Sequence, residues 1–368
     1  MKKFQVFIAV DSLVMGGIQK SLVAFIRSVK SFCEIDILVW HENDLEMIRL
    51  PEYVNRIHVI GTESVRTAYR KYGIFSLNFL FSALGSMRKK RWLAVPRLKK
   101  KYDIAIAYSH VSSLKYYTID KVTAEKKFAF YHHGAYIFSE KIRRYDLEYY
   151  QQYDKVYAVS DGVKKLLMKT FPELHNISVL PNLIDVEEIK KCAGEPCPEF
   201  PDDQRLRLLT VGRLSPEKNP MQIIETARLL VEKRVKFIWM IVGDGELRQT
   251  LESTIRENKL EGKVVLTGNQ MNPYRFMSRC DCYLQFSLYE ADPVTVREAA
   301  VFDRHMVLSD IPGFRDCSMI LKNINLCRNA EEAADRILHI LDKPADKNNL
   351  EKLNSEIVKQ IYHEMFDI

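Results

Sequence analysis

The sequence predicts an α/β protein of two domains. Short apolar runs typical of buried strands alternate with helical stretches along the chain, and this alternation predicts parallel sheets covered by helices on both faces. The series begins a second time after a segment rich in proline and acidic residues at 184–205. The length of 368 residues is also long for one hydrophobic core and suits two domains.

The composition is that of an ordinary globular protein. Hydrophobic residues make up 47% of the chain, and no run approaches the roughly 20 apolar residues of a membrane span. The segment Met1–Asp11 has a charged head and a short apolar run, which we interpret as a first strand rather than a signal peptide. The seven cysteines fit no zinc-binding spacing, so we expect reduced thiols in a cytoplasmic protein.

Charge is distributed unevenly between the two halves. Residues 1–183 hold 29 Lys and Arg against 17 Asp and Glu, a net charge of +12. Residues 184–368 hold 26 against 31, a net charge of −5. A basic first half suggests contact with an anionic surface.

The first predicted strand, Phe4–Val10, leads through a loop into a helix from Ile18 to Val29. Gly16 and Gly17 in this loop lie where α/β folds bring the backbone close to a phosphate. The spacing is neither Gly-x-Gly-x-x-Gly nor that of a P-loop, and a tight turn alone would also explain two glycines. The later strands predicted in this half are Ile35–Trp40, Ile57–Ile60, Ile104–Tyr108, Phe128–Tyr131, Val156–Val159 and Ser178–Leu180.

The segment Arg88–Lys101 carries eight basic residues and no acidic one, with apolar side chains between them. We predict that it docks on an anionic membrane, where each basic residue near the surface contributes about 1 kcal/mol. The alternatives are a solvated helix and loop, or a nucleic-acid patch, which no accompanying motif supports. We therefore expect no nucleic-acid partner. The residues predicted to contact the membrane are Arg88, Lys89, Lys90, Arg91, Trp92, Lys99, Lys100 and Lys101.

A histidine pair, His132-His133, follows a predicted strand and precedes Gly134. Ligands bind at strand ends in parallel α/β sheets, and His133 could hydrogen-bond a sugar or phosphate oxygen there. The alternative is a packed loop histidine. A metal site is not supported, because no carboxylate or Cys lies at a fitting spacing. His110 is a weaker candidate of the same kind.

The second half begins with a predicted strand, Leu206–Val211, and a tight turn that contains Arg213 and Lys218. Two cations at a strand end can neutralise a diphosphate, although exposed loop cations are the alternative. The later strands predicted here are Lys236–Val242, Val264–Thr267, Cys282–Phe286, His305–Leu308 and Asn323–Leu326. We thus expect a first domain at 1–183, a linker at 184–205, a second domain at 206–349 and a helix at 350–368 that packs back across the linker.

The stretch Tyr289–Ala300 predicts a strand-turn-helix element. Asp292 is a candidate N-cap, and Pro293 suits the first helical position. The unpaired N–H groups of Val294 and Thr295 at such a helix start would favour an anion.

Two glutamates flank this helix start. Glu290 lies in the turn and Glu298 in the helix, and a carboxylate can accept hydrogen bonds from vicinal hydroxyls. Phosphate on the amides and hydroxyls on the carboxylates together suit a sugar nucleotide. Two Glu at this spacing also occur by chance.

Taken together, the chain resembles the retaining GT-B glycosyltransferases called family 4. The similarity covers nearly the whole length and implies two Rossmann-like domains facing a central cleft. It implies that a nucleotide sugar binds mainly to the second domain and the acceptor mainly to the first. The matching elements are Gly16-Gly17, His133-Gly134, Val159–Lys165, Pro181–Asp185, Val211–Leu214 with Lys218, Val242–Gly245, and the Glu-x7-Glu element from Glu290 to Glu298.

The resemblance implies catalytic roles for Glu290, His133, Arg213 and Lys218. Arg213 and Lys218 would hold the diphosphate in place of a divalent metal, Glu290 would contact the transferred sugar, and His133 would lie beside it. Glu298 would hold the ribose hydroxyls, and no cofactor besides the donor is implied. The full donor site would comprise Gly16, Gly17, Arg213, Lys218, Glu290, Ala291, Asp292, Pro293, Val294, Thr295 and Glu298.

The chain departs from the family pattern in the turn, where Glu290-Ala291-Asp292 replaces Glu-Gly-Phe. Asp292 would place a second carboxylate near the sugar and could alter donor choice. Further along, Phe302–Val307 replaces a usual Gly-x-Pro stretch, and Gly313–Asp316 loosely replaces Gly-x-x-Glu.

The expected function is transfer of a hexose, with retention, from a nucleotide sugar to a lipid-linked or polysaccharide-precursor acceptor in cell-surface glycan synthesis. We expect a UDP-hexose donor and a peripheral location at the cytoplasmic face of the cell membrane. One alternative is a catalytically silent nucleotide-sugar-binding subunit that supports a partner glycosyltransferase. An NAD-dependent dehydrogenase is disfavoured, because no Gly-x-Gly-x-x-Gly follows the first strand of either domain.

Overall fold

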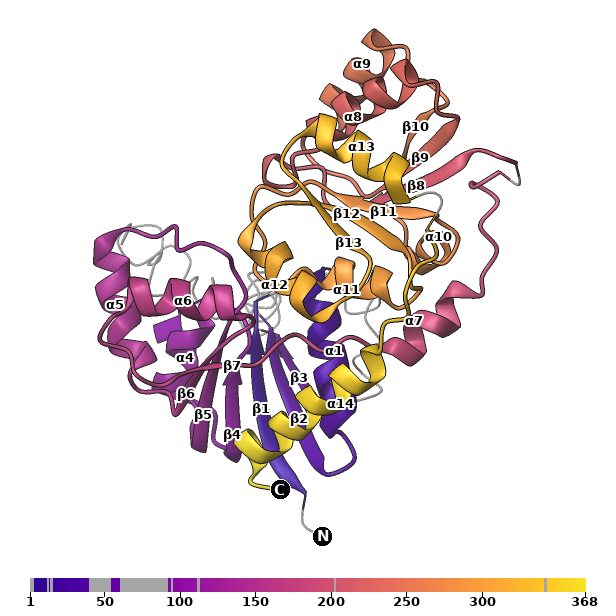
Figure 1. Ribbon diagram of the computed structural model, residues 1–368. Helices are drawn as coiled ribbons and strands as arrows, with labels where there is room; N and C mark the ends of the chain where they lie inside the picture. The colour runs from indigo at the N-terminus through magenta and orange to yellow at the C-terminus, as the bar shows by residue number, and fades with distance from the viewer. Residues whose placement is uncertain are drawn as a thin grey trace, which may run out of the picture. The chain divides into compact units, whose positions relative to one another are not determined.

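The chain divides into two units. Unit 1 comprises Met1–Leu183 and Glu356–Ile368, and unit 2 comprises Ile184–Ser355. The structure is a computed structural model (Figure 1). It describes residues 3–11, 13, 16–39, 54–59, 92–93, 95–110, 113–201, 203–340 and 343–368.

The described part of unit 1 contains a seven-stranded parallel sheet in the order β3-β2-β1-β4-β5-β6-β7. The order reverses between β1 and β4, which pair with each other at Val6 and Ile104. The strands are β1 (Phe4–Val10), β2 (Cys33–Val39), β3 (Arg56–Val59), β4 (Lys101–Ala107), β5 (Thr123–Tyr131), β6 (Lys155–Ala158) and β7 (Ile177–Val179).

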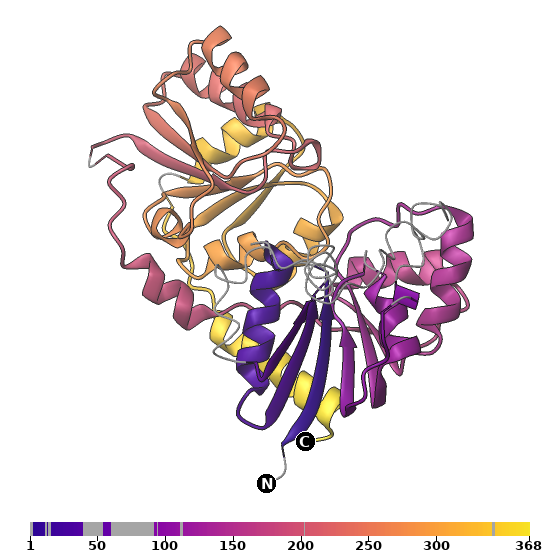
Figure 2. The same ribbon diagram turned by 180° about the vertical axis from the view of Figure 1, so that it is seen from behind.

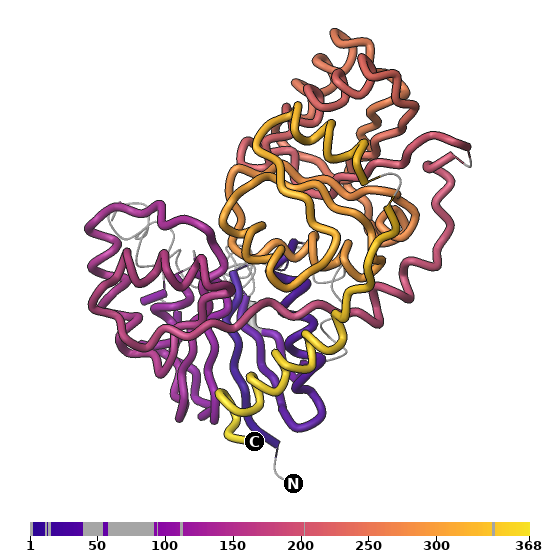
Figure 3. Tube along the Cα trace, viewed as in Figure 1, coloured from indigo at the N-terminus to yellow at the C-terminus, as the bar shows by residue number. Residues whose placement is uncertain are grey.

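In the described part of unit 1, a helix follows each of β1, β4, β5 and β6 and packs on the sheet (Figures 1 and 2). The α6 helix begins where the Ser160 hydroxyl accepts a hydrogen bond from the Val163 N–H at 3.3 Å, the usual N-cap contact. The last residues of the chain return to β1, where the Phe366 ring lies 5.2 Å from that of Phe4 (Figure 3). The helices that lie wholly in the described part of unit 1 are α1 (Gly17–Val29), α4 (Leu114–Lys121), α5 (Glu140–Tyr150), α6 (Asp161–Thr170) and the π-helical turn Tyr362–Phe366.

Unit 2 contains a six-stranded parallel sheet in the order β10-β9-β8-β11-β12-β13. Its β9 strand is buried at all six positions, as expected of a strand covered on both faces. Again the order reverses between the first strand, β8, and β11. The strands are β8 (Leu206–Val211), β9 (Phe237–Val242), β10 (Val264–Gly268), β11 (Cys282–Gln285), β12 (His305–Ser309) and β13 (Ile324–Cys327).

Two hydrophobic clusters lie on the two faces of this sheet. One includes Trp239 of β9 with Ala333 of α13, and the other includes Met240 of β9 with Val296 of α11. Neighbouring strand residues point to opposite faces, so helices cover both sides. The helices of unit 2 are α7 (Val186–Ala193), the 3₁₀ turn η2 (Pro216–Lys218), α8 (Met221–Glu232), α9 (Arg248–Glu257), α10 (Tyr274–Met277), α11 (Val294–Ala300), α12 (Pro312–Ile320), α13 (Ala330–Ile340) and the first part of α14 (Leu350–Ile361).

The predicted α/β class is confirmed. Both sheets have the 3-2-1-4-5-6 strand order of the Rossmann fold, extended by one strand in unit 1. Ligands of such sheets bind beyond the carboxyl ends of the strands where the order reverses. The ends of β1 and β4 in unit 1, and of β8 and β11 in unit 2, are therefore the places to examine for a site.

The segment expected to be a linker contains α7 and belongs to unit 2. The carbonyl oxygen of Cys192 accepts a hydrogen bond from the Asn272 amide at 2.7 Å. Helix α14 begins in unit 2 and ends in unit 1. In unit 2, its Asn354 amide donates to the carbonyl of Ile184 at 2.6 Å.

In the ranges that the structure describes, no helix has both the length and the apolar character needed to cross a membrane.

Candidate functional site

The strand-order reversal in unit 2 brings two loops together. The loop after β8 contains η2, which ends at Lys218, and the loop after β11 contains Glu290. The Leu288 N–H donates to the carbonyl oxygen of Glu217 at 2.8 Å, which ties the two loops to each other. Lys218 and Glu290, 72 positions apart in the chain, thus become neighbours.

Lys218 and Glu290 form an ion pair, with 2.5 Å between Nζ and Oε1. Two further donors reach the same carboxylate oxygen, the Ser287 hydroxyl at 2.7 Å and the Gln285 side-chain amide at 2.6 Å. The Lys218 and Glu290 side chains retain 26% and 12% exposure. The pair is therefore held by the protein yet reachable by a ligand.

Gln285 is the last residue of β11, and its side chain is bonded at both ends. Its Oε1 accepts from the hydroxyls of Tyr283 at 2.8 Å and Thr295 at 3.0 Å. Its Nε2 donates to Glu290, as above, and to the Ser287 hydroxyl at 3.2 Å. A polar network therefore runs from β11 to the first turn of α11.

Close backbone packing fixes the loops around this network. A Cβ at Gly313 would lie 2.4 Å from the carbonyl oxygen of Glu290, so only glycine allows α12 to approach the turn so closely. Gly243 has φ +143°, and a Cβ there would lie 1.9 Å from the carbonyl oxygen of Gly212. The loops after β8 and β9 are thus packed backbone against backbone.

Glu298 lies in α11 with only 1% exposure. The Tyr274 hydroxyl donates to its Oε1 at 2.8 Å. Burial, together with the negative charge of Glu298, raises the pKa of Tyr274 far above its usual range. Tyr274 therefore remains a protonated donor to this carboxylate.

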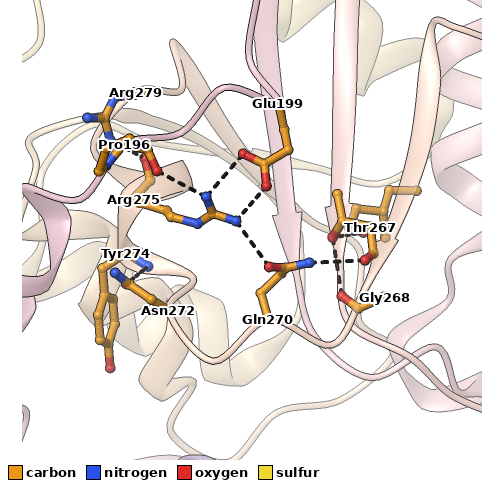
Figure 4. A network of polar contacts seen from close by, with 10 residues as sticks. Pro196, Glu199, Thr267, Gly268, Gln270, Asn272, Tyr274, Arg275 and Arg279 are labelled. Carbon is orange, nitrogen blue, oxygen red and sulfur yellow. Dashed lines mark hydrogen bonds and ion pairs between the residues drawn. The ribbon is translucent and has the colours of Figure 1, made fainter.

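Figure 4 shows the network that holds the segment around Tyr274. The Arg275 guanidinium donates to both carboxylate oxygens of Glu199, at 2.5 and 3.1 Å, and to the Gln270 side-chain oxygen at 3.1 Å. The Asn272 side chain accepts from the Tyr274 N–H at 3.1 Å. Bidentate pairs of this kind are geometrically specific, so the loop between β10 and α10 is tightly fixed.

The helix start predicted at Asp292 and Pro293 needs correction. Helix α11 begins at Val294, and Pro293 is its N-cap, with φ −76° and ψ 91°. Asp292 instead pairs with Arg297 at 3.0 Å, with only 3% and 4% of the side chains exposed. Because it is buried in this pair, the Asp292 carboxylate does not stand free beside a sugar, contrary to our expectation.

The other predicted residues of unit 2 lie in the loop after β8, in the turn after β11 or in α11. Ala291 and Val294 are buried, whereas Thr295 is half-buried and bonds Gln285. Arg213, in the same loop as Lys218, is exposed. Burial acts to raise the pKa of Glu217, but on balance this pKa is lowered, in part by the positive charges of Arg213 and Lys218.

Unit 1 places Gly16, Gly17 and His133 at strand ends. Gly16 is the N-cap of α1, the helix that follows β1 in the chain, and Gly17 is its first residue. Nδ1 of His133 lies 2.7 Å from the carbonyl oxygen and 3.1 Å from the nitrogen of Ala135. These contacts fix the ring within the loop after β5.

The two neighbouring histidines are buried. Burial lowers the pKa of His110 to about 2 and that of His132 to about 4. Both rings are therefore neutral at physiological pH. His133, which is half-buried, is the most accessible of the three.

The prediction for Trp92 in the basic segment is wrong. Trp92 is 0% exposed, packs with Tyr116 at 4.7 Å between ring centroids, and donates its indole N–H to Asp120 at 2.7 Å. A side chain enclosed in this way cannot anchor a membrane. Arg88, Lys89, Lys90 and Arg91 lie outside the described residues.

The remaining lysines of that segment differ in their surroundings. Lys99 and Lys101 are exposed. Lys100 donates to Asp36 at 3.0 Å, a carboxylate with 3% exposure. Of these three lysines, Lys99 and Lys101 are therefore available to an anionic surface, whereas Lys100 is engaged with Asp36.

Sequence reasoning missed four residues of the unit 2 site. Gln285, Ser287, Tyr274 and Arg297 each bond a predicted residue. The single signal in the sequence was the polar Gln285 at the end of an otherwise apolar strand, since a buried polar group needs a partner.

The match to a known protein family lies almost entirely in unit 2. Residues 198–357 match the family model described as glycosyl transferases group 1. An uncharacterized glycosyltransferase of Methanocaldococcus jannaschii is 28% identical over 168 residues, or 44% of this chain and 41% of that protein.

Two further relatives are named for an activity. One is the N-acetylgalactosamine-N,N'-diacetylbacillosaminyl-diphospho-undecaprenol 4-alpha-N-acetylgalactosaminyltransferase of Campylobacter jejuni, 32% identical over 38% of this chain and 37% of that protein. The other is the UDP-Gal:alpha-D-GlcNAc-diphosphoundecaprenol alpha-1,3-galactosyltransferase of Escherichia coli, 26% identical over 50% and 52%. The chain therefore spans about half the length of these relatives, or less.

Solved structures resemble the whole chain. Anabaena HepE in complex with UDP and glucose has a TM-score of 0.75 at 13% identity, over 99% of this chain and 100% of that one. The lipopolysaccharide outer core galactosyltransferase WaaB in its apo form has a TM-score of 0.62 at 17% identity, over 100% and 99%. At such identities the likeness shows the fold, which is GT-B. The chain thus has the GT-B fold, and its residues 198–357 are similar to the glycosyl transferases of group 1.

Proposed function

We propose that this protein is a retaining, metal-independent glycosyltransferase of family 4. It transfers a hexose from a UDP-sugar to a lipid-linked or polysaccharide-precursor acceptor in cell-surface glycan synthesis. The observation that carries the proposal is the Lys218–Glu290 pair beyond the ends of β8 and β11, at the point of unit 2 where the strand order reverses.

The cations of the β8 loop suit a diphosphate leaving group. Transfer from a nucleotide sugar builds negative charge on the departing diphosphate, and fixed cations stabilise that charge without reorganising. Lys218 is held in place by Glu290, and Arg213 is exposed in the same loop. In this role Lys218 would bind the phosphate as a point charge, and Arg213 would bind it as a planar fork.

The carboxylates suit the two sugars of the donor. Glu290 would accept a hydrogen bond from the transferred hexose, and Glu298, held by Tyr274, would accept from the ribose. Backbone N–H groups of Ala291, Asp292, Val294 and Thr295 would line the donor site, with Pro293 between them. Gly16, Gly17 and His133 are proposed to contribute from unit 1.

The relatives support the donor and acceptor classes. The structures of HepE contain UDP with glucose, or UDP-glucose. The relatives from Campylobacter jejuni and Escherichia coli are named for sugar acceptors linked to diphosphoundecaprenol. A UDP-hexose donor and a lipid-diphosphate-linked acceptor are therefore the combination to test first.

An acceptor of this kind resides in a membrane, so we place the protein at the cytoplasmic membrane face. The attachment would rest on Arg88–Arg91, Lys99 and Lys101, without Trp92. Arginine and lysine near an anionic leaflet contribute about 1 kcal/mol each.

A transfer assay tests the proposal. The protein is incubated with UDP-glucose, UDP-galactose or their N-acetyl forms and a short polyprenyl-diphosphate-linked sugar. Formation of an α-linked product with release of UDP is expected. Donor binding without transfer or hydrolysis would instead favour a silent binding subunit, and neither binding nor transfer would contradict both.

A further inference from the structure

Glu290 receives three hydrogen-bond donors on a single oxygen. Lys218 Nζ, Gln285 Nε2 and the Ser287 hydroxyl all lie within 2.7 Å of Oε1. Within the described ranges, no hydrogen bond or ion pair reaches Oε2 of this carboxylate. The protein therefore occupies one oxygen fully and leaves the second for a ligand.

Gln285 and Ser287 are both enclosed, the latter with 1% exposure, but only Gln285 offers an amide that is also bonded at its far end. Its side chain belongs to a residue with 3% exposure at the end of β11. Lys218 reaches Glu290 from the flexible end of a long side chain. An enclosed amide with bonds at both ends has one position only, so it can define where the carboxylate lies.

Chemistry fixes which end of the Gln285 amide meets Glu290. A carboxylate only accepts hydrogen bonds, so the group that faces it must be the N–H₂ end. The opposite end then accepts from the hydroxyls of Tyr283 and Thr295, at 2.8 and 3.0 Å. Turning the amide over would place its oxygen against the Glu290 carboxylate, which has no proton to donate, so the carboxylate sets the orientation and the two hydroxyls hold the far end.

We propose that Gln285 is a positioning residue for the transferred sugar. It holds Oε1 of Glu290 against Lys218, so that Oε2 alone is presented to the donor hexose. This inference rests on the proposed function, since it assigns Glu290 to the hexose. Gln285 itself touches neither the diphosphate-binding cations nor Glu298 among the described contacts.

The test is Gln285→Met, which keeps the length of the side chain and removes both ends of the amide. The matched control is Gln360→Met in unit 1. There too an amide donates to a carboxylate, that of Glu364, at 2.8 Å, and to the carbonyl of Val179, also at 2.8 Å. Both variants lose a hydrogen bond from an amide to a carboxylate, but only in Gln285→Met is that carboxylate Glu290.

Gln285→Met is expected to lower kcat for transfer about 10- to 100-fold, because a small misplacement of a reacting group has effects of this size. The Kd for UDP is expected to stay within threefold of the wild type. Gln360→Met should keep kcat within twofold. A Gln285→Met protein with unchanged kcat, or one that is folded but loses UDP binding in parallel with kcat, would overturn the inference.

Thr295→Val provides a second variant if Gln285→Met does not fold. It removes one of the two hydroxyls that orient the amide, and a smaller drop in kcat, about threefold to tenfold, is expected. An unchanged kcat would count against the positioning role.

A crystal structure of Gln285→Met gives a readout that does not depend on activity. A displaced Glu290 carboxylate supports the inference, and an unmoved one overturns it. If the wild type binds no nucleotide sugar while Glu290 moves in the variant, the proposed function fails and the positioning contact stands.

Discussion

Lys218 Nζ lies 2.5 Å from Oε1 of Glu290, although the two residues come from loops after different strands. The ion pair holds the cation at this position and restricts its motion. The ion pair contributes little to the stability of the fold, because the lysine is partly exposed. Its consequence is instead functional, because a preplaced cation needs no reorganisation when charge develops nearby.

Replacing Lys218 tests the cation directly. Lys218→Met should lower kcat for transfer about 100- to 1,000-fold, the range seen when one preorganised electrostatic group is removed. The control is Lys233→Met, which removes a cation paired with Asp335 at 3.1 Å on the surface. A steady-state assay with a UDP-hexose measures both, and a Lys218→Met enzyme within threefold of the wild type contradicts the assignment.

Stability should respond strongly to the Asp292–Arg297 pair. Both side chains are almost fully buried, so Asp292→Ala leaves an unpaired buried charge and should lower the free energy of unfolding of unit 2 by about 3–5 kcal/mol. The double variant Asp292→Leu with Arg297→Met should recover most of this loss. Urea denaturation of the variants compares them, and an Asp292→Ala effect below 1 kcal/mol would refute the buried pairing.

Stability should also fall on mild acidification because of His110 and His132. Burial lowers their pKa values to about 2 and about 4, whereas in the unfolded chain both titrate near pH 6.5. The unfolded state therefore binds more protons below pH 6.5, and the stability contributed by the neutral rings is lost as pH falls from about 6.5 towards 4.

Between pH 7.5 and 5.0 each ring should account for a loss of about 2 kcal/mol in the free energy of unfolding. Chemical denaturation at the two pH values measures the difference. A variant with His110→Gln and His132→Gln should show a flatter pH dependence, and an unchanged slope would rule out these rings as its source.

Membrane attachment is predicted to depend on Arg88–Arg91. Changing all four to alanine should weaken sedimentation with vesicles that contain anionic lipid by about 100-fold or more at low salt, given about 1 kcal/mol per basic residue. Binding of the wild type should also fall as salt rises. The control, Arg143→Ala with Arg144→Ala, removes one half-buried and one exposed cation of α5, both paired with Glu140. Equal binding of all three proteins would argue against attachment through this segment.

The fold was largely predictable because each strand is a short apolar run between helical stretches. Leu206–Val211 was predicted with the bounds of β8, and the alternation correctly indicated parallel sheets. Lys218 and Glu290 could be singled out because each stands in a turn after such a run. Their 2.5 Å separation could not be predicted, since it depends on β8 and β11 being neighbours in the sheet.

The predictions for single residues were wrong where the bonding partner is distant in the sequence, or where the geometry of a turn determines which side chains meet. Trp92 stands next to basic residues, but its partner Asp120 lies 28 residues away in α4. Local charge therefore gave the wrong face for this side chain. Asp292 was expected to cap the helix, yet Arg297 lies within reach once the turn has formed. The sequence shows Gln285 as a polar residue in an apolar strand, but it does not indicate that Glu290 is the hydrogen-bond partner.

The central claim is that unit 2 binds the nucleotide part of a sugar donor. The most direct measurement is a thermal-shift panel of UDP-, GDP- and ADP-hexoses on the wild type and on Glu298→Ala. Ligand at about 100 times its Kd adds roughly 2.7 kcal/mol to stability, which is visible as a shift in Tm. We predict a shift with UDP-hexoses alone that is lost in Glu298→Ala, and no shift with any of these donors would contradict the claim.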